Sequence, residues 1–277
     1  MIGSSAARAR LYRQALPYLG ILGLLIAWQL GILISQQTLL PGPLTVAASL
    51  VHLAVDGHLF SHIVASLFRV TWGYVLAAVV AIPLGLLLGW SVRSGRAAGP
   101  ILQFLRPISP IAWTPLAILF FGIGDLSTVF IIFIAVLWPL AMSSIEAAMT
   151  VNIKFVRAGR NFGLSTRALL FKIILSAALP QLILGMRLSL GIAWLVMVAG
   201  EMIASHSGLG FLIIDARNAG NRYDEVIAGM IVIGVLGVLL DTLMRRLQAS
   251  RALAWNYNRL TSDPTTEGPL ERRRARR

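Results

Sequence analysis

Cysteine is absent from the 277 residues, and charged residues make up only 13% of them. Without cysteine the chain has no disulfide framework, thiolate metal site or cysteine nucleophile. Soluble globular chains carry about a quarter charged residues, so this deficit argues against a cytosolic enzyme. The high share of hydrophobic residues, 57%, also argues against disorder. This composition is typical of a membrane protein.

Lysine is nearly absent as well, since Lys154 and Lys172 are the only two in the chain. Neither follows a glycine, as the phosphate-binding loop Gly-x4-Gly-Lys-Ser/Thr requires, so the usual means of hydrolysing ATP is missing. No Ser-His-Asp or paired-carboxylate arrangement is placed for catalysis. His58 and His62 lack a third metal ligand, and we interpret them as a solvated pair. We therefore expect neither an enzyme nor a metal site.

Apolar runs long enough to cross about 30 Å of hydrocarbon recur along the chain. We expect an all-α membrane protein with six transmembrane helices, at residues 17–35, 70–92, 107–124, 126–145, 181–203 and 226–244. Most of the 24 basic residues fall before the first run, between the second and third, between the fourth and fifth, and after the sixth. Because basic loops stay on the cytoplasmic side, both termini are predicted to be cytoplasmic. This distribution explains the net charge of +13 without nucleic acid.

The expected organisation follows from these runs. We predict a cytoplasmic N-terminus (1–16), a first transmembrane helix (17–35), an outer segment (36–60), a core with five further helices (61–247) and a basic, disordered tail (248–277). Residues 146–180 form a long basic cytoplasmic segment within the core. Connections of this length in a compact bundle are usually functional.

That cytoplasmic segment contains Arg157-Ala158-Gly159, then Gly163-Leu164, then Ile173 and Leu175. It resembles the loop of ABC-importer permeases, whose pattern is Glu-Ala-Ala-x3-Gly-x9-Ile-x-Leu-Pro. Arg157 replaces the glutamate, Gly159 the second alanine and Ser176 the proline. From the residues alone, an Arg-rich helix lying on lipid is an equal alternative.

Other strings, in order, strengthen the resemblance. They are Leu39-Leu40-Pro41-Gly42-Pro43, Leu105-Arg106-Pro107-Ile108-Ser109-Pro110, Trp113-Thr114-Pro115, Gly185-Met186-Arg187-Leu188, Ala193-Trp194 and Gly208-Leu209-Gly210-Phe211. Together they are similar to the nitrate/sulfonate/taurine/bicarbonate branch of these permeases over about residues 40–247.

The resemblance implies a type I ABC-importer permease fold in a bacterial inner membrane. It also implies a second permease copy, two ATP-binding subunits that bind ATP and Mg²⁺, and a periplasmic solute-binding protein. The segment 146–180 would be the ATPase-coupling loop. In such a loop, small residues such as Ala158 and Gly159 would allow another protein's surface to approach, and Gly163 would let the chain turn.

Polar and proline residues within the spans are candidates for the translocation pathway or a gate. They are Arg106, Trp113, Pro115, Arg187, Trp194 and Glu201. Structural interpretations compete with this one. Glu201 is expected to pair with Arg217 or Arg222, while Arg187 is expected to snorkel or to hold a loop carbonyl.

The function that the sequence favours is import of a small oxyanion or sulfonate, driven by ATP hydrolysed on another subunit. The alternative is a secondary transporter or channel, in which the charges within the helices would couple ions directly. The sequence does not distinguish among nitrate, bicarbonate, taurine and alkylsulfonates.

Overall fold

The computed structural model describes residues 19–20, 22–34, 40–90 and 92–248. Within this part of the chain the regular structure is entirely helical, as the apolar runs predict. The expected N-terminal segment 1–16 lies outside the described residues, and so does all of the expected basic tail except Gln248.

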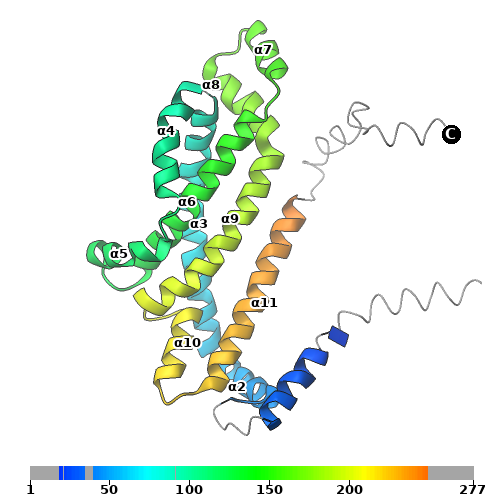
Figure 1. Ribbon diagram of the computed structural model, residues 1–277, viewed down its shortest axis with the longest axis vertical. Helices are drawn as coiled ribbons and strands as arrows, with labels where there is room; N and C mark the ends of the chain where they lie inside the picture. Colours follow the sequence, from blue (N-terminus) through cyan, green and yellow to red (C-terminus); the bar gives the residue numbers. More distant parts are fainter. Residues whose placement is uncertain (1–18, 21, 35–39, 91, 249–277) are drawn as a thin grey trace, which may run out of the picture.

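Long helices run side by side along the molecule, with short helices at both ends (Figure 1). After an apolar helix at Leu22–Ile34, the elements are α2 (Pro43–Val55), α3 (His58–Trp90), α4 (Val92–Leu105), the 3-10 turn η1 (Pro110–Trp113), α5 (Thr114–Phe121), α6 (Asp125–Met149), α7 (Ile153–Asn161), α8 (Thr166–Ala168), the π-helix η2 (Leu169–Ile174), α9 (Leu175–Ala204), α10 (Leu209–Asn218) and α11 (Tyr223–Gln248). Figure 1 places α7 and α8 at one end of the bundle and α2 and α10 at the other.

Four described helices are long and apolar enough to cross a membrane, or five if one bent pair is counted as a single span. They are α3, α6, the continuous helix Thr166–Ala204 and α11. The first expected span, 17–35, is described only in part, as the short apolar helix Leu22–Ile34. Six spans are therefore not seen in the described residues.

The expected third span, 107–124, differs from the structure in its bounds, because the candidate span here begins earlier and is sharply bent. Two helical pieces, Ala97–Leu105 and Pro110–Phe121, meet there at 87°. Pro107 and Pro110 cause the break, because proline lacks the N–H that continues a helix and disfavours helical geometry in the residue before it. The second piece comprises η1 and α5, and it leaves the side of the bundle (Figure 1).

The core of the bundle lies where α3 and α9 pack against α6. Gly85 and Gly89 of α3 bring its backbone close to α6, as small residues at Gly-x3-Gly spacing allow. A Cβ atom at Gly89 would lie 2.6 Å from the carbonyl oxygen of Ile145 and 2.7 Å from the Cβ of Ala148. Gly185 of α9 lies equally close to Ser143 on another face of α6.

Replacing Gly89 with valine should destabilise the bundle, because a backbone carbonyl blocks the new side chain and cannot rotate away. We expect the free energy of unfolding in detergent to fall by about 1–3 kcal/mol. Gly191→Val in α9 is the matched control, since a Cβ atom there meets nothing within 4 Å. Equal thermal midpoints for the two variants would contradict this packing.

Candidate functional site

The segment between α6 and α9 forms a helical hairpin. The side chain of Asn152 caps α7 by accepting a hydrogen bond from the N–H of Lys154 at 2.9 Å. Gly163 then turns the chain, with φ at +75°, a conformation that suits glycine. Ser165 caps the next helix by accepting from the N–H of Ala168. The turn expected at Gly163 is therefore present.

Gly159 is buried against η2 of the same chain. A Cβ atom there would clash with Ile173 and lie 2.6 Å from the Cδ2 atom of Leu169. These are the ends of flexible side chains, so a larger residue at this position would displace them, and the approach of another protein to Gly159 stays a prediction. Arg157 and Ala158, by contrast, are exposed on the hairpin.

The remaining residues of the pattern tie α7 to α9. Leu164 is half-buried and donates its N–H to the carbonyl oxygen of Gly159 at 3.1 Å. Ile173 lies in η2, and Leu175 begins α9. Because η2 runs directly into α9, the hairpin rests on the end of a long continuous helix.

Large apolar side chains are exposed on this hairpin. Phe162 at the tip is 86% exposed, and Ile153, Phe155 and Phe171 are also exposed. On the inner side, the guanidinium of Arg160 lies 5.7 Å from the ring centre of Trp90, which is close enough for a cation–π contact. The hairpin is therefore held on one side and presents aromatic side chains on the other.

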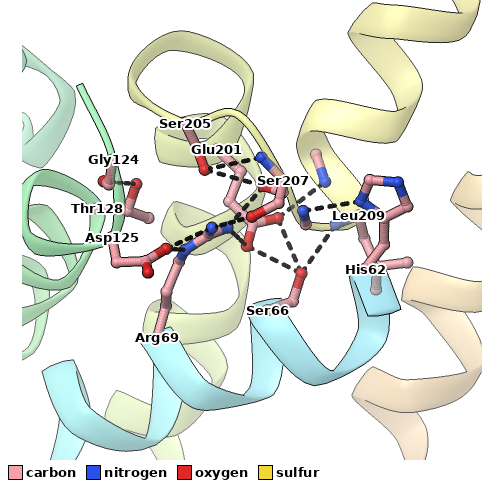
Figure 2. Close-up of polar contacts among 12 residues, drawn as sticks. His62, Ser66, Arg69, Gly124, Asp125, Thr128, Glu201, Ser205, Ser207 and Leu209 are labelled. Atoms are coloured by element: carbon pink, nitrogen blue, oxygen red, sulfur yellow. Dashed lines mark hydrogen bonds and ion pairs between the residues drawn. The ribbon is translucent and has the colours of Figure 1, made fainter. Parts of the chain in front are cut away.

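A second polar site lies at the opposite end of the bundle and centres on Arg69 (Figure 2). This α3 arginine is 1% exposed, and Glu201 of α9, 2.7 Å away, is fully buried. Its Nε and Nη2 atoms donate to Asp125 Oδ1 at 2.8 and 2.6 Å. The two Nη atoms also donate to the carbonyl and hydroxyl oxygens of Ser207. These contacts use the full donor capacity of the guanidinium.

Glu201 also fixes the start of α10. Its Oε2 atom accepts from the N–H of Gly210 at 2.9 Å, and Ser66 Oγ accepts from the N–H of Leu209 at 2.8 Å. Ser66 in turn donates to the carboxylate of Glu201. A carboxylate at a helix N-terminus is favourable because the unpaired N–H groups there carry partial positive charge. Gly208, with φ at +101°, lies so close to Glu201 that a Cβ atom would clash with the carboxylate.

These contacts correct the expected pairing of Glu201. Glu201 does not pair with Arg217 or Arg222. Its partner is Arg69, and Arg222 pairs with Glu225 one helical turn away. Arg69 lies one third of the way along a helix that begins 11 residues earlier, so it is an interior cation.

His62 is not a solvated residue paired with His58. It is half-buried, its ring stacks near Phe211, and its Nδ1 atom accepts from the N–H of Gly208 at 3.0 Å. Within the described residues, no group of three histidine, aspartate or glutamate side chains could hold a metal ion.

Two candidate pathway residues on α9 contact α11. Arg187 forms a two-point ion pair with Asp241, with Nε 2.7 Å from Oδ1, so its partner is a carboxylate and not a loop carbonyl. Trp194 is buried and donates its indole N–H to the carbonyl oxygen of Ile233 at 3.1 Å. Both residues therefore connect α9 to α11. Glu201, further along α9, likewise connects α9 to other helices.

The other three candidates lie at the break between α4 and α5. Arg106 is exposed in the turn after α4, and Pro115 is exposed in the first turn of α5. Trp113 ends η1 and is half-buried. These three residues thus lie in one break of the chain, whereas Arg187, Trp194 and Glu201 lie on α9.

The described structure is a bundle of long apolar helices that could cross a membrane, with an exposed hairpin at one end, which is the architecture of a membrane protein. Residues 81–252 match the family model of the binding-protein-dependent transport system inner membrane component, and the chain belongs to that family. It is 34% identical to the bicarbonate transport system permease protein CmpB of Synechococcus elongatus over 89% of this chain and 94% of the relative. It is also 34% identical to the taurine transport system permease protein TauC of Escherichia coli, over 89% and 92%.

Solved structures confirm the fold. An inward-facing structure of the MetNI methionine ABC transporter matches with a TM-score of 0.62, over 69% of this chain and 94% of that chain. The sequence identity is 17%, so this similarity concerns the fold alone. The chain is an inner membrane component with the fold of an ABC-importer permease.

Replacing Arg69 with methionine should cost about 3–5 kcal/mol of stability, because it leaves the buried Glu201 carboxylate without its counter-charge. The double variant Arg69→Met/Glu201→Met should recover most of this loss, since both charges are then gone. Thermal unfolding in detergent measures both effects. The control, Arg245→Met, breaks an exposed pair with Asp241 and should leave the midpoint nearly unchanged. A double variant less stable than Arg69→Met would refute the pairing.

Proposed function

We propose that this chain is the membrane-spanning permease subunit of an ATP-driven importer for a small oxyanion or sulfonate, in the range of nitrate, bicarbonate, taurine and alkylsulfonates. The observation that carries the proposal is the α7–α8 hairpin. It presents Phe155, Phe162 and Phe171 to the outside at one end of a membrane bundle. Aromatic side chains of this kind are typical anchors of protein interfaces. The relatives' names supply the substrate range.

The partner at the hairpin is an ATP-binding subunit, which binds ATP and Mg²⁺ and hydrolyses ATP. Lys154, Arg157 and Arg167 are exposed on the same segment as these aromatic residues and favour an acidic groove on that subunit. Gly159 packs directly on Leu169 and Ile173 of η2, so a force on α7 passes into α9 through side-chain contacts. Movement of the ATP-binding subunits thereby reaches the core of the bundle.

The rest of the assembly follows the same proposal. The hairpin end and both chain termini face the cytoplasm, in line with the basic residues around α7. The α10 end faces a periplasmic solute-binding protein. Two copies of this chain form the membrane unit. Its other surroundings are lipid, which accounts for the many exposed leucine, valine and phenylalanine side chains of α3 and α11.

A secondary transporter, the alternative function, receives less support from the polar residues. Such a transporter needs ionisable groups in its spans that change partners as ions bind. Here the interior carboxylate Glu201 is bound by Arg69, Ser66 and the N-terminus of α10, and Asp241 is bound by Arg187. These groups serve as connections between helices.

Purification of the chain from its native membrane in mild detergent tests the proposal. We expect an ATP-binding subunit to co-purify, and a periplasmic binding protein to stimulate the ATPase activity of the complex. Recovery of the chain alone, with solute movement in vesicles that needs no ATP, would instead establish the secondary transporter.

Replacing Gly163 with valine should uncouple ATP hydrolysis from transport. Its φ of +75° strains a β-branched residue by about 1–2 kcal/mol, although space for a side chain is open. Gly163→Asn is the matched control, because asparagine tolerates this conformation. In vesicles containing the whole complex, we expect reduced uptake per ATP hydrolysed for valine and normal coupling for asparagine. Normal coupling by both variants, at equal membrane levels, would show that the turn is unimportant.

A further inference from the structure

The break between α4 and α5 contains two buried hydrogen-bond donors without partners. Thr114 is only 4% exposed, yet its hydroxyl has no hydrogen-bond partner among the described residues. The indole N–H of the preceding residue, Trp113, is buried and unpaired in the same way. Among the described residues, Trp138 Nε1 of α6 is a third buried side-chain atom without a partner, but only Trp113 and Thr114 are consecutive in the chain.

Unpaired buried donors are costly. Each such group loses its hydrogen bonds to water, at about 1–3 kcal/mol, and gains nothing in return. Native structures hold few of them, and those that persist call for a functional or structural reason. The indole N–H can only donate, so the partner that suits it must be an acceptor such as an oxyanion.

The charge around the break points to the same kind of ligand. Arg106 in the turn after α4 is exposed and has no ion-pair or hydrogen-bond partner for its side chain within the described part of the chain. No aspartate or glutamate occurs between Asp56 and Asp125. A cation and two donors, with no acidic residue in the same stretch of chain, favour an anion.

The break also lies inside a candidate membrane span, because the helical pieces Ala97–Leu105 and Pro110–Phe121 are together long and apolar enough to cross a membrane. Ser127 donates its hydroxyl to the carbonyl oxygen of Ala117 at 3.0 Å, which fixes α5 against the first turns of α6. Ala117 packs with Ile131 of α6 and Ala204 of α9. Both α6 and the continuous helix containing α9 are spans, so the break lies beside membrane-crossing segments. Irregular backbone at this depth is tolerated where it is covered by protein or lines an aqueous path.

We propose that the Trp113 indole N–H and the Thr114 hydroxyl, in the same break as Arg106, form a contact site for the oxyanion or sulfonate group of the solute within the membrane. This inference rests on the proposed import function and adds a site to it. The two donors are unpaired in this conformation and bind the solute's oxygens when the path opens. The site recognises negatively charged oxygen, which nitrate, bicarbonate and sulfonates share.

Direct binding to the permease complex tests this site. Isotope-labelled nitrate, bicarbonate and taurine are the probes, and the one that the wild-type complex takes up in an ATP-dependent manner is used for the variants. Equilibrium dialysis against the complex, without the binding protein, then gives its affinity. Thr114→Val should weaken binding about tenfold, because it removes a hydrogen bond to a charged group. Trp113→Phe should have a similar effect.

Two controls separate this role from a structural one. Thr114→Ser keeps the hydroxyl and should bind as the wild type does. Thr128→Val removes a buried hydroxyl that already has an acceptor, the carbonyl oxygen of Gly124, and should also leave affinity unchanged. Thr114→Val should unfold at the same temperature as the wild type or higher, because it removes an unpaired buried group.

The outcomes distinguish the two proposals. If the wild-type complex takes up none of the three probes with ATP, the proposed substrate range is wrong. If it takes up a probe but does not bind it without the binding protein, or if Thr114→Val binds it as tightly as the wild type, the contact site is refuted and the import function stands. Lower affinity together with a lower unfolding temperature for Thr114→Val would likewise refute the site, because packing would explain the loss.

Discussion

At one end of this permease, the buried guanidinium of Arg69 connects several helices to one another. Removing its charge from water is expensive, and only a nearly complete set of acceptors makes such burial tolerable. Those acceptors come from the start of α6, the end of α9 and the turn before α10. Three separate parts of the chain must therefore be in place before Arg69 can be buried. The arrangement specifies how these elements meet, in addition to any stability that it contributes.

The same network contains one solvent-facing member. Arg69 and Glu201 are fully enclosed, whereas the side chain of Asp125 is 59% exposed. Asp125 begins α6 directly after the turn that contains Gly122 and Gly124, both with positive φ. The enclosed pair thus belongs to the fixed framework of α3, α9 and α10. The exposed carboxylate links that framework to the segment that carries the break and α5.

The sequence was informative where a pattern is local. Runs of apolar residues located α3, α6, α9 and α11, and the spacing around Gly163 located the hairpin. The 87° bend could be anticipated only as a kink, because the prolines mark a break without giving its direction. The partner of Glu201 could not be predicted. Arg69 is 132 residues away in sequence, and it interrupts the apolar pattern of α3 near its first third. The apolar residues Leu59, Phe60, Ile63 and Val64 were the available signal that this helix begins before Arg69.

The π-helix η2 joins the hairpin to α9 through a wider turn than an α-helix has. A π-turn accommodates one extra residue without breaking the helix, and each residue of an α-helix rotates the chain by about 100°. The orientation of the hairpin around α9 therefore depends on a one-residue surplus in Leu169–Ile174. Loss of a single residue there would regularise the helix and turn the aromatic tip to another side of the molecule, although every residue of the hairpin itself would be preserved. The number of residues in η2 therefore constrains the orientation of the hairpin as strongly as the identity of those residues does.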